Sequence, residues 1–337
     1  MKALYTKSRY QFELRNVTLR EPAYNEVVVR VEACGLCGTD IRTARDAADF
    51  EPFGHEVAGI VEKAGEHVKN VSPGDRVVLE SGSYDRFSDL SRNGHCDLDN
   101  NGRHFFNMGY EGAGFGFAER LIASDEVCVK YDGLSLAEAS LIEPLGVAYD
   151  LVKVTDIALG DNVLVSGIGT IGLCALRLAK LRGAKRVVAV NTKGRGARRD
   201  AAFAYGADDV LTVGEDDIEK YGCRFDRVMV TSPPQSMPGL LRVMNTGGVM
   251  GFIGIETGDA AFATFDINLW HFGKLQIRSS YAAPALFFPA CIDLARSGMI
   301  DLSILHTHDL ALDSFKEGFD AYMADRDNAI KAIMFNK

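Results

Sequence analysis

The sequence predicts an α/β protein with two domains, a barrel-like β domain and a domain built on a doubly wound parallel sheet. The chain has 337 residues, enough for two domains at roughly 100 to 200 residues each. Residues 27–129 contain short strand-like segments separated by glycine and polar turns, as in a barrel. From residue 162 to about 281, apolar strands alternate with helical segments, which is typical of a parallel sheet covered by helices on both faces.

Five segments of the first region are strand candidates, because apolar residues recur along them and turn residues bound them: EVVVRVEA, EVAGIVEKAG, DRVVLE, FAERLIAS and EVCVKY. The pattern changes at Ser135, which has Glu138 three residues later. This is the spacing of a capping box at the start of a helix. We expect this helix to lead into the second domain.

The tail of the chain, from Pro284 to Lys337, contains two amphipathic helical segments and a final strand, AIKAIMF. We expect this tail to return to the first domain. The predicted barrel-like domain is therefore discontinuous, with residues 1–150 and 282–337. The predicted parallel-sheet domain comprises residues 151–281.

The composition excludes several classes of protein. Hydrophobic residues make up 47% of the chain and charged residues 25%, which is ordinary for a globular protein. No apolar run approaches the ~20 residues of a membrane helix, and the first residues lack the apolar core of a secretory signal, so we expect a cytoplasmic protein. The net charge of −9 opposes binding to nucleic acid or to an anionic membrane surface.

A glycine-rich motif lies between an apolar strand and a helix in the second region. Gly167, Gly169 and Gly172 have the spacing Gly-x-Gly-x-x-Gly, and Thr170 and Ile171 lie between the last two glycines. In a dinucleotide site the first glycine permits a tight turn, the second lets the backbone approach a pyrophosphate and the third allows close helix packing. We therefore predict a dinucleotide site. The alternative is a turn in a sheet protein that binds no nucleotide.

The next strand candidate ends at Asn191, where the residue that reads the cofactor's ribose is expected. An Asn lacks the carboxylate that accepts a hydrogen bond from the 2′-hydroxyl of NAD. Four basic residues follow within seven positions, in the run Thr192, Lys193, Gly194, Arg195, Gly196, Ala197, Arg198 and Arg199. Because such a cluster attracts a 2′-phosphate, NADP is favoured over NAD. The alternative is a solvated, basic helix start.

Cys34 and Cys37 form a CxxC motif, typical of a redox pair or of half a zinc knuckle. The chain has no second CxxC, and the motif follows a strand in a strand-rich region and not in a βαβ unit, which weakens both interpretations. His55 and Glu56 lie side by side after Cys37. Cys, His and a carboxylate, with a fourth position left for water or substrate, are a donor set for catalytic zinc, where the metal acts as a Lewis acid. The seven cysteines are an odd number and are expected to be thiols or metal ligands.

These residues belong to a longer arrangement, Gly54-His55-Glu56-x-x-Gly59-x5-Gly65-x-x-Val68, followed by Gly74-Asp75-Arg76-Val77 and Leu141-Ile-Glu143-Pro144-Leu145. With the glycine-rich turn and the C-terminal return, it resembles the zinc-dependent alcohol dehydrogenases of the medium-chain dehydrogenase/reductase superfamily. The resemblance covers nearly the whole chain and is strongest to the sorbitol (polyol) and sugar dehydrogenase branch. It implies a GroES-like β-barrel catalytic domain and a Rossmann nucleotide domain.

The resemblance also implies functional residues. A catalytic Zn²⁺ would be held by Cys37, His55 and Glu56, with Glu143 near the metal, either as an occasional ligand or holding the zinc-bound water. The alternative for Glu143 is a carboxylate on a helix surface. Thr39 would be the inner hydroxyl of the path by which the substrate's proton leaves. Relatives commonly form dimers or tetramers through the last strand of the nucleotide sheet, which here would be LQIRSSYAA, so we expect a homodimer or homotetramer.

The sequence differs from the pattern of this family in three places. Many relatives have a structural zinc bound by four cysteines after the GDRV strand, whereas residues 81–109 contain only Cys96, so we expect one zinc and no structural zinc. Arg42 replaces the His that often forms the outer step of the proton path. Ser280 replaces an Arg that commonly precedes the aromatic residue at Tyr281 in the polyol branch, which puts sorbitol itself in doubt.

The function predicted from these observations is the zinc-dependent transfer of hydride between a secondary alcohol, a polyol or sugar, and NAD(P). An amino alcohol of the threonine type or a small diol is the alternative within the same chemistry. From another class, the chain could be a zinc-free NADPH-binding protein, either quinone-reductase-like or structural. A redox role for Cys34 and Cys37 would require both thiols to be free.

Overall fold

The computed structural model describes residues 1–337 except 83, 100–115, 283–285 and 337. Its internal contacts divide the chain into two compact units. Unit 1 comprises residues 1–146, 282–325 and 331–337, and unit 2 comprises residues 147–281 and 326–330. The short segment 326–330 was assigned to the barrel-like domain from the sequence, but its contacts place it in the parallel-sheet unit.

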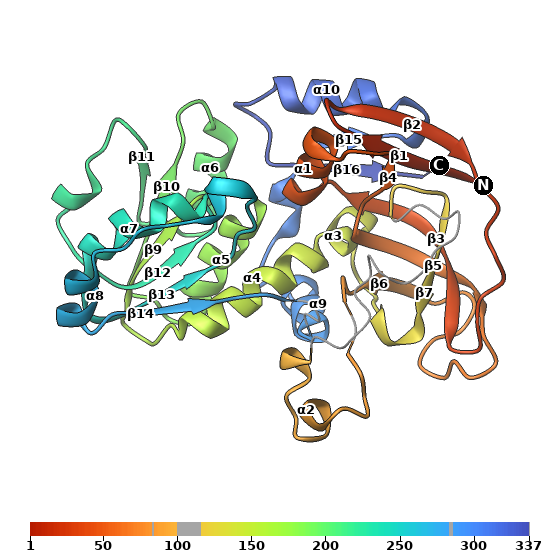
Figure 1. Ribbon diagram of the computed structural model, residues 1–337, viewed down its shortest axis with the longest axis horizontal. Coiled ribbons are helices and arrows are strands. Elements are labelled where there is room, and N and C mark those ends of the chain that lie inside the picture. The colour runs from red at the N-terminus through yellow and green to blue at the C-terminus, as the bar shows by residue number, and fades with distance from the viewer. Residues whose placement is uncertain (83, 100–115, 283–285, 337) are drawn as a thin grey trace. The chain divides into compact units, whose positions relative to one another are not determined.

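Unit 1 is built around a sheet whose strand order is β15-β16-β3-β5-β6-β8, with β7 also paired to β3; its pairs are antiparallel except β15 with β16, which is parallel. The long central strand β3 carries buried valines at positions 27, 28, 29 and 31, and it pairs with β5, β7 and β16 (Figure 1). A smaller sheet has the order β2-β1-β4. The strands are β1 (Lys2–Lys7), β2 (Gln11–Asn16), β3 (Glu26–Gly35), β4 (Glu51–Pro52), β5 (Glu56–Ala64), β6 (Arg76–Leu79), β7 (Arg120–Ser124), β8 (Cys128–Lys130), β15 (His306–Leu310) and β16 (Lys331–Phe335).

The sequence predicts a capping box at the start of one helix of unit 1. The Ser135 hydroxyl accepts from Glu138 N and the Glu138 carboxylate accepts from Ser135 N, so the predicted capping box is present. The helix expected after it is interrupted at Leu141, and a second helix follows in which Pro144 occupies the first turn, where its missing N–H costs little. The helices are α1 (Gly38–Asp46), α2 (Asp89–Arg92), α3 (Leu136–Ser140), α4 (Ile142–Thr155, which continues into unit 2), α9 (Phe288–Arg296) and α10 (Phe315–Ala324).

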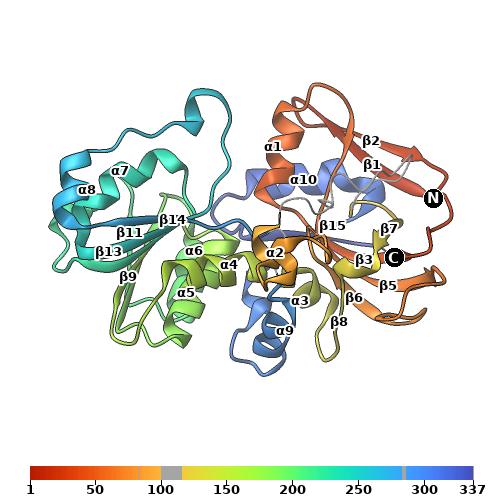
Figure 2. The same cartoon turned by 60° about the horizontal axis from the view of Figure 1, so that its bottom comes forward.

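Unit 2 is a parallel sheet with the strand order β11-β10-β9-β12-β13-β14. Helices α5 and α6 lie on one face and α7 and α8 on the other (Figure 2). From β9 the chain proceeds through β10 to β11 at one edge of the sheet, and it then returns to place β12 on the other side of β9. Ligands of such folds bind where the strand order changes direction, here between β9 and β12. The elements are β9 (Asn162–Ser166), α5 (Thr170–Leu181), β10 (Arg186–Asn191), α6 (Gly196–Ala204), β11 (Asp209–Thr212), β12 (Phe225–Val230), α7 (Met237–Leu240), β13 (Met244–Phe252), α8 (Ile267–Gly273) and β14 (Gln276–Ser279).

The core of unit 2 explains why its strands are almost continuously apolar. Leu164, Val188 and Met250 from three strands of the sheet are fully buried and pack in one cluster with Met237 and Leu241, which follow β12. A strand with helices on both faces has no solvated side, so it lacks the polar alternation of a half-exposed strand. The doubly wound fold predicted from the sequence is thus confirmed.

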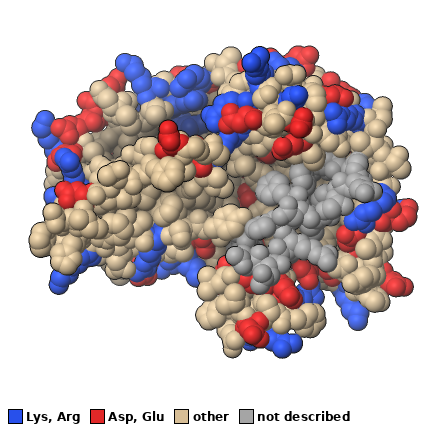
Figure 3. All heavy atoms as spheres, viewed as in Figure 1, with Lys and Arg blue, Asp and Glu red and all other residues tan. Residues whose placement is uncertain are grey.

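Charged side chains of both signs are interspersed on the face drawn in Figure 3. Within the described part of the chain, none of the helices has the length and apolar character needed to cross a bilayer.

The lobe between β6 and residue 99 is organised by a buried carboxylate. Asp99 is 2% exposed, and its Oδ2 accepts hydrogen bonds from Asp85 N (3.1 Å), Ser88 Oγ (2.6 Å) and Ser91 Oγ (3.3 Å). These three donors lie on both sides of the start of α2, so one acceptor joins the turns of the lobe.

We predict that Asp99→Ala loosens this lobe, because it leaves three hydrogen-bond donors without their buried acceptor. The free energy of unfolding should fall by about 1–3 kcal/mol, and amide hydrogen exchange should quicken in residues 84–98. The matched control is Asp97→Ala, since Asp97 is exposed. Equal exchange in the two variants would contradict this role for Asp99.

Candidate active site

One carboxylate connects the two loops that carry the predicted metal ligands. Asp40, in the first turn of α1, is 2% exposed. Its Oδ2 accepts from Cys37 N at 2.8 Å, and its Oδ1 accepts from Gly54 N at 3.0 Å. The first bond completes a capping box at Cys37, the N-cap of α1. Asp40 therefore fixes the backbone on both sides of the site before any ion binds.

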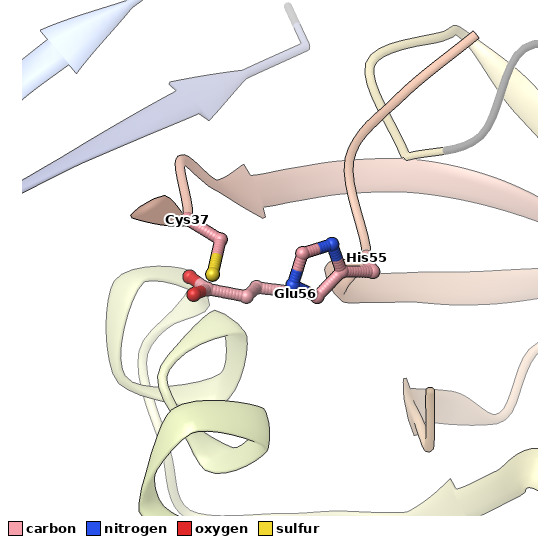
Figure 4. A group of neighbouring side chains, drawn as sticks. All are labelled: Cys37, His55 and Glu56. Atoms are coloured by element: carbon pink, nitrogen blue, oxygen red, sulfur yellow. The ribbon is translucent and has the colours of Figure 1, made fainter. Parts of the chain in front are cut away.

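The donor atoms of Cys37, His55 and Glu56 lie within 4.8 Å of one another, and the three side chains converge (Figure 4). Cys37 precedes α1, His55 is in the loop after β4, and Glu56 is the first residue of β5. Gly54 has φ +95, and a Cβ there would lie 2.6 Å from the Phe117 ring. The turn that presents His55 and Glu56 thus requires glycine at this position.

The surroundings of His55 favour a positive charge at the site. Its Nδ1 lies 3.5 Å from Asp40 Oδ1, so Asp40 can orient the ring, as carboxylates commonly do for metal-bound histidines. Burial lowers the pKa of the imidazole, but Asp40 and Cys37 raise it by more, and the net pKa is well above its ordinary value. A site that attracts a proton to His55 in this way also attracts a metal cation.

Glu56 forms a buried ion pair with a residue from the far end of the chain. Lys331 Nζ, at the start of β16, lies 2.6 Å from Glu56 Oε1 and 2.5 Å from Oε2, and it also donates to Leu36 O at 3.0 Å. Burial lowers the pKa of Lys331, but Glu56 and Cys37 raise it by more, so that the ammonium is stabilised. A Cβ on Gly35 would overlap Glu56 Oε2, so this glycine provides the space for the pair.

Glu143 lies in the first turn of α4, next to the group of three donors but not within it. Burial, together with the nearby Glu56, raises the pKa of its carboxyl to about 7, although His55, Lys331 and a hydrogen bond from Ser81 act in the opposite direction. Since Glu143 is 7% exposed, the alternative of a carboxylate on a helix surface does not apply.

The remaining residues near Cys37 have distinct surroundings. Thr39 Oγ1 lies 3.7 Å from Cys37 Sγ, so the predicted inner hydroxyl is beside the donor group. Cys34 is fully buried, and burial raises the pKa of its thiol well above the ordinary value. A thiol in this state is a poor nucleophile. Neither Cys34 nor Cys37 is in a disulfide.

The glycine-rich turn has the geometry of a phosphate-binding loop. Gly167 has φ +91, and a Cβ on Gly172 would overlap the Gly167 carbonyl oxygen, so both glycines are required by the backbone. A Cβ on Gly169 would have only Arg198 Nη1 near it, at 3.8 Å. Helix α5 starts at Thr170, with Ile171 in its first turn, and its N-terminal N–H groups suit an anion.

The side chain of Asn191 shapes the turn that follows β10. Its Oδ1 accepts from Thr192 N at 2.9 Å, and its Nδ2 donates to Arg195 O at 3.0 Å. In the basic cluster, Lys193 pairs with Glu215 at 2.8 Å. The arginines donate to main-chain carbonyls: Arg195 to Arg326 O, Arg198 to Ala329 O and Arg199 to Val210 O.

Three residues of the site were missed from the sequence: Asp40, Ser81 and Lys331. For Asp40 a signal was available, because an acidic residue three positions after Cys37 has capping-box spacing. Lys331 is flanked by apolar residues in the predicted strand AIKAIMF, and a lysine at a buried strand position requires a buried partner. Nothing local to Ser81 indicates that it faces Glu143.

Comparison with known proteins places the chain in a family. Residues 23–133 match the family of alcohol dehydrogenase GroES-like domains, and residues 170–296 match the zinc-binding dehydrogenases. L-idonate 5-dehydrogenase of Vitis vinifera is 32% identical over 340 residues, covering 92% of this chain and 88% of its own. Sorbitol dehydrogenase of Arabidopsis thaliana is 30% identical over 342 residues, covering 93% and 88%. The structure of 2R,3R-butanediol dehydrogenase from Bacillus subtilis matches with a TM-score of 0.84 and 25% identity, covering 100% of this chain and 99% of that chain.

The fold and the sequence matches define a zinc-binding dehydrogenase with a GroES-like domain and a Rossmann domain. Within that class, the chain belongs to the zinc-dependent alcohol dehydrogenases of the medium-chain dehydrogenase/reductase superfamily, in their polyol and sugar dehydrogenase branch. It is an NAD(P)-dependent oxidoreductase. The predicted family, fold class and type of enzyme are confirmed.

We predict that Lys331→Met strongly destabilises the metal-free protein, because it leaves the buried Glu56 carboxylate without a counter-charge. The free energy of unfolding should fall by roughly 3–5 kcal/mol, measured by urea denaturation with a chelator present. Adding Glu56→Gln to this variant should restore part of the lost free energy of unfolding, because it removes the unpaired buried charge. The control is Lys316→Met, which breaks the exposed pair with Asp320 and should cost about 1 kcal/mol or less. Similar losses in the two single variants would contradict the role of the buried pair.

Proposed function

We propose that this enzyme catalyses the reversible oxidation of a secondary alcohol, a polyol or sugar, at a single zinc ion. The observation that carries the proposal is the convergence of Cys37, His55 and Glu56 within 4.8 Å in a chain of the zinc-dependent family. Two of the relatives are named for the oxidation of a polyol or sugar acid, sorbitol and L-idonate. Their full-length similarity supports a polyhydroxylated substrate.

The residues present fit a zinc ion by their chemistry. Thiolate, imidazole and carboxylate are the donors that zinc prefers, and three of them leave one position open in a tetrahedral site, as catalysis requires. Cys37, His55 and Glu56 would hold the ion. Glu143 would approach as an occasional fourth ligand or through a water molecule. In the lobe after β6, residues 84–99 are organised by Asp99, and we propose no structural zinc there.

The chain's own residues prepare the site for an alcohol. Zinc, when bound, supplies a positive charge that lowers the pKa of a coordinated hydroxyl by several units. Asp40 holds the Cys37 and His55 loops at a fixed separation, and Lys331 limits the positions open to the Glu56 carboxylate. The Thr39 hydroxyl, 3.7 Å from Cys37 Sγ, would accept the substrate's proton and pass it outward without an imidazole, since Arg42 stands where many relatives have His.

For the cofactor we propose NADP. Asn191 provides no carboxylate to repel a 2′-phosphate, and its side chain is used to close the turn after β10. The three arginines of the cluster donate to main-chain carbonyls, which are neutral, so their positive charges are not cancelled by these contacts. The phosphate would be recognised by Lys193 and Arg195, and the pyrophosphate by Gly167, Gly169, Thr170, Ile171 and Gly172.

Sorbitol itself is a less suitable substrate than other polyols or sugars. The Arg that commonly precedes the aromatic residue in this branch is replaced by Ser280, which is 7% exposed and whose hydroxyl donates to Asp150 at 2.6 Å. This position therefore supplies no cation toward a hydroxylated substrate. An amino alcohol of the threonine type or a small diol is the second candidate, and a zinc-free NADPH-binding protein is the candidate of another class.

We also propose that the protein is a homodimer or homotetramer. Strand β14 is the edge strand of the parallel sheet in unit 2, and a free strand edge is suited to pairing with a second copy. A monomeric mass in sedimentation would refute this assembly.

Zinc dependence and substrate class are tested together. A purified protein should contain one zinc per chain, and Cys37→Ser should lose that zinc and lower kcat/KM by at least about 100-fold, as expected when a Lewis acid worth several kcal/mol is lost. Cys96→Ser is the matched control and should keep its zinc. The assay is a screen of polyols, aldoses and amino alcohols with both cofactors. Activity that is indifferent to a chelator would favour the zinc-free alternative, and turnover confined to amino alcohols would exclude a polyol.

The cofactor proposal predicts a kcat/KM for NADP at least about tenfold above that for NAD, which corresponds to about 1.4 kcal/mol of added stabilisation by the 2′-phosphate. Raising the salt concentration should reduce the ratio, because the contact is between charges near the surface. An enzyme that prefers NAD would refute the choice of cofactor without affecting the metal site.

A further inference from the structure

A five-residue segment, 326–330, connects α10 to β16 but packs with the parallel-sheet unit. We call it the crossing segment. Its residues Ala329 and Ile330 are buried, whereas Arg326 and Asp327 are exposed. Hydrogen bonds join it to residues 195–198 of unit 2, directly after the turn that follows β10. The C-terminal part of the chain thus contacts the basic cluster assigned above to the cofactor.

Two main-chain carbonyls of the crossing segment hold arginine side chains. Arg195 Nη1 donates to Arg326 O at 3.0 Å, and Arg198 Nε donates to Ala329 O at 3.1 Å. A guanidinium group is rigid and planar, so one directed hydrogen bond also orients its other N–H groups. Because a carbonyl carries no net charge, these two hydrogen bonds orient the arginines without adding an opposite charge.

Asp327 holds the backbone between these two arginines. Its Oδ1 accepts from Gly196 N at 2.8 Å, and its carbonyl oxygen accepts from Ala197 N at 2.9 Å. Both N–H groups belong to the first turn of α6 (Gly196–Ala204), where a helix has no acceptor of its own. A Cβ on Gly196 would come within 3.1 Å of Asp327 Oδ1, so the two segments are in close contact.

The two arginines lie next to different parts of a dinucleotide site. Arg198 Nη1 is the atom nearest to the side of Gly169, the glycine that lets the backbone approach a pyrophosphate. Arg195 follows the end of β10, and its carbonyl accepts from Asn191, at the position that reads the ribose. The crossing segment therefore orients Arg195 near the position that reads the ribose, which carries the 2′-phosphate, and Arg198 near the turn that binds the pyrophosphate.

We propose that Asp327 is a positioning residue for recognition of the 2′-phosphate. By fixing the start of α6 on the crossing segment, it holds Arg195 in the orientation that receives this phosphate, and Arg198 at the pyrophosphate turn. The proposal rests on the use of NADP proposed above. Asp327 acts through the two arginines and does not itself touch the cofactor.

The charge and the hydrogen bond of Asp327 have opposite effects on phosphate binding. A carboxylate repels a bound phosphate, whereas the bond to Gly196 N orders the residues that attract it. Asp327→Asn keeps an oxygen acceptor and removes the charge, while Asp327→Ala removes both. If positioning is the dominant effect, only the alanine variant loses affinity for the 2′-phosphate.

The test measures binding of two probes by calorimetry, 2′,5′-ADP and 5′-AMP, which differ only in the 2′-phosphate. Asp327→Ala should weaken binding of 2′,5′-ADP by about tenfold, with a smaller effect on 5′-AMP, and Asp327→Asn should bind as the wild type does. In the assay, Asp327→Ala should raise KM for NADP and leave kcat unchanged. The matched control is Asp320→Ala, which removes an exposed aspartate paired with Lys316 on α10 and should change neither probe.

Several results would overturn the role of Asp327 without affecting the proposed use of NADP. These are an unchanged affinity of Asp327→Ala for 2′,5′-ADP, a loss in Asp327→Asn equal to that in Asp327→Ala, or tighter binding in either variant, which would mean that charge repulsion is the larger effect. A wild-type protein that binds both probes equally would instead refute the use of NADP, and this inference with it. The wild-type ratio and the change caused by the variants thus separate the two failures.

Discussion

A carboxylate removed from water requires a compensating charge. In unit 1 this requirement brings together two segments that are far apart in the sequence. Glu56 is buried at the start of β5, and Lys331, 275 residues later, supplies the charge. On the other side, Asp40 binds the backbone of the loops that hold Cys37 and His55. Every donor of the proposed metal site is therefore held by a residue outside the donor set. The donor geometry is set by the folded chain before a metal binds.

The two sites treat charge in different ways. Around Cys37, His55 and Glu56, buried charges are paired with opposite charges, since an unpaired ion inside a protein is very costly. After β10, Arg195 and Arg198 donate to neutral carbonyl groups near the surface, so these two contacts orient the guanidinium groups without adding an opposite charge. Buried ion pairs suit a site that must be rigid, and cations oriented by neutral groups suit a site that attracts an anion from solution.

Local patterns were sufficient to predict most of the fold and part of the site. The strand periodicity, the capping box at Ser135 and the glycines of the 167–172 turn each depend on a few neighbouring residues, and all are found in the structure. The break at Leu141 was not foreseen, because the apolar pattern continues through it. Lys331 and the contacts of Asp327 could not be derived, since they depend on which distant segments meet. Asp40 was available from its spacing and was overlooked.

The partnership of Glu56 and Lys331 also bears on how the protein is made. Lys331 lies 275 residues after Glu56, so a ribosome must add all of these residues before the carboxylate of Glu56 can meet its ammonium partner. Strand β16, which must insert beside β3, is likewise synthesised long after that strand. The barrel can begin to form as its early strands appear, but it cannot be completed until β16 has been synthesised. This contact of very large sequence separation belongs to the class whose formation slows folding, and it makes completion of the metal site depend on a segment that is translated after the whole parallel-sheet unit has begun to form.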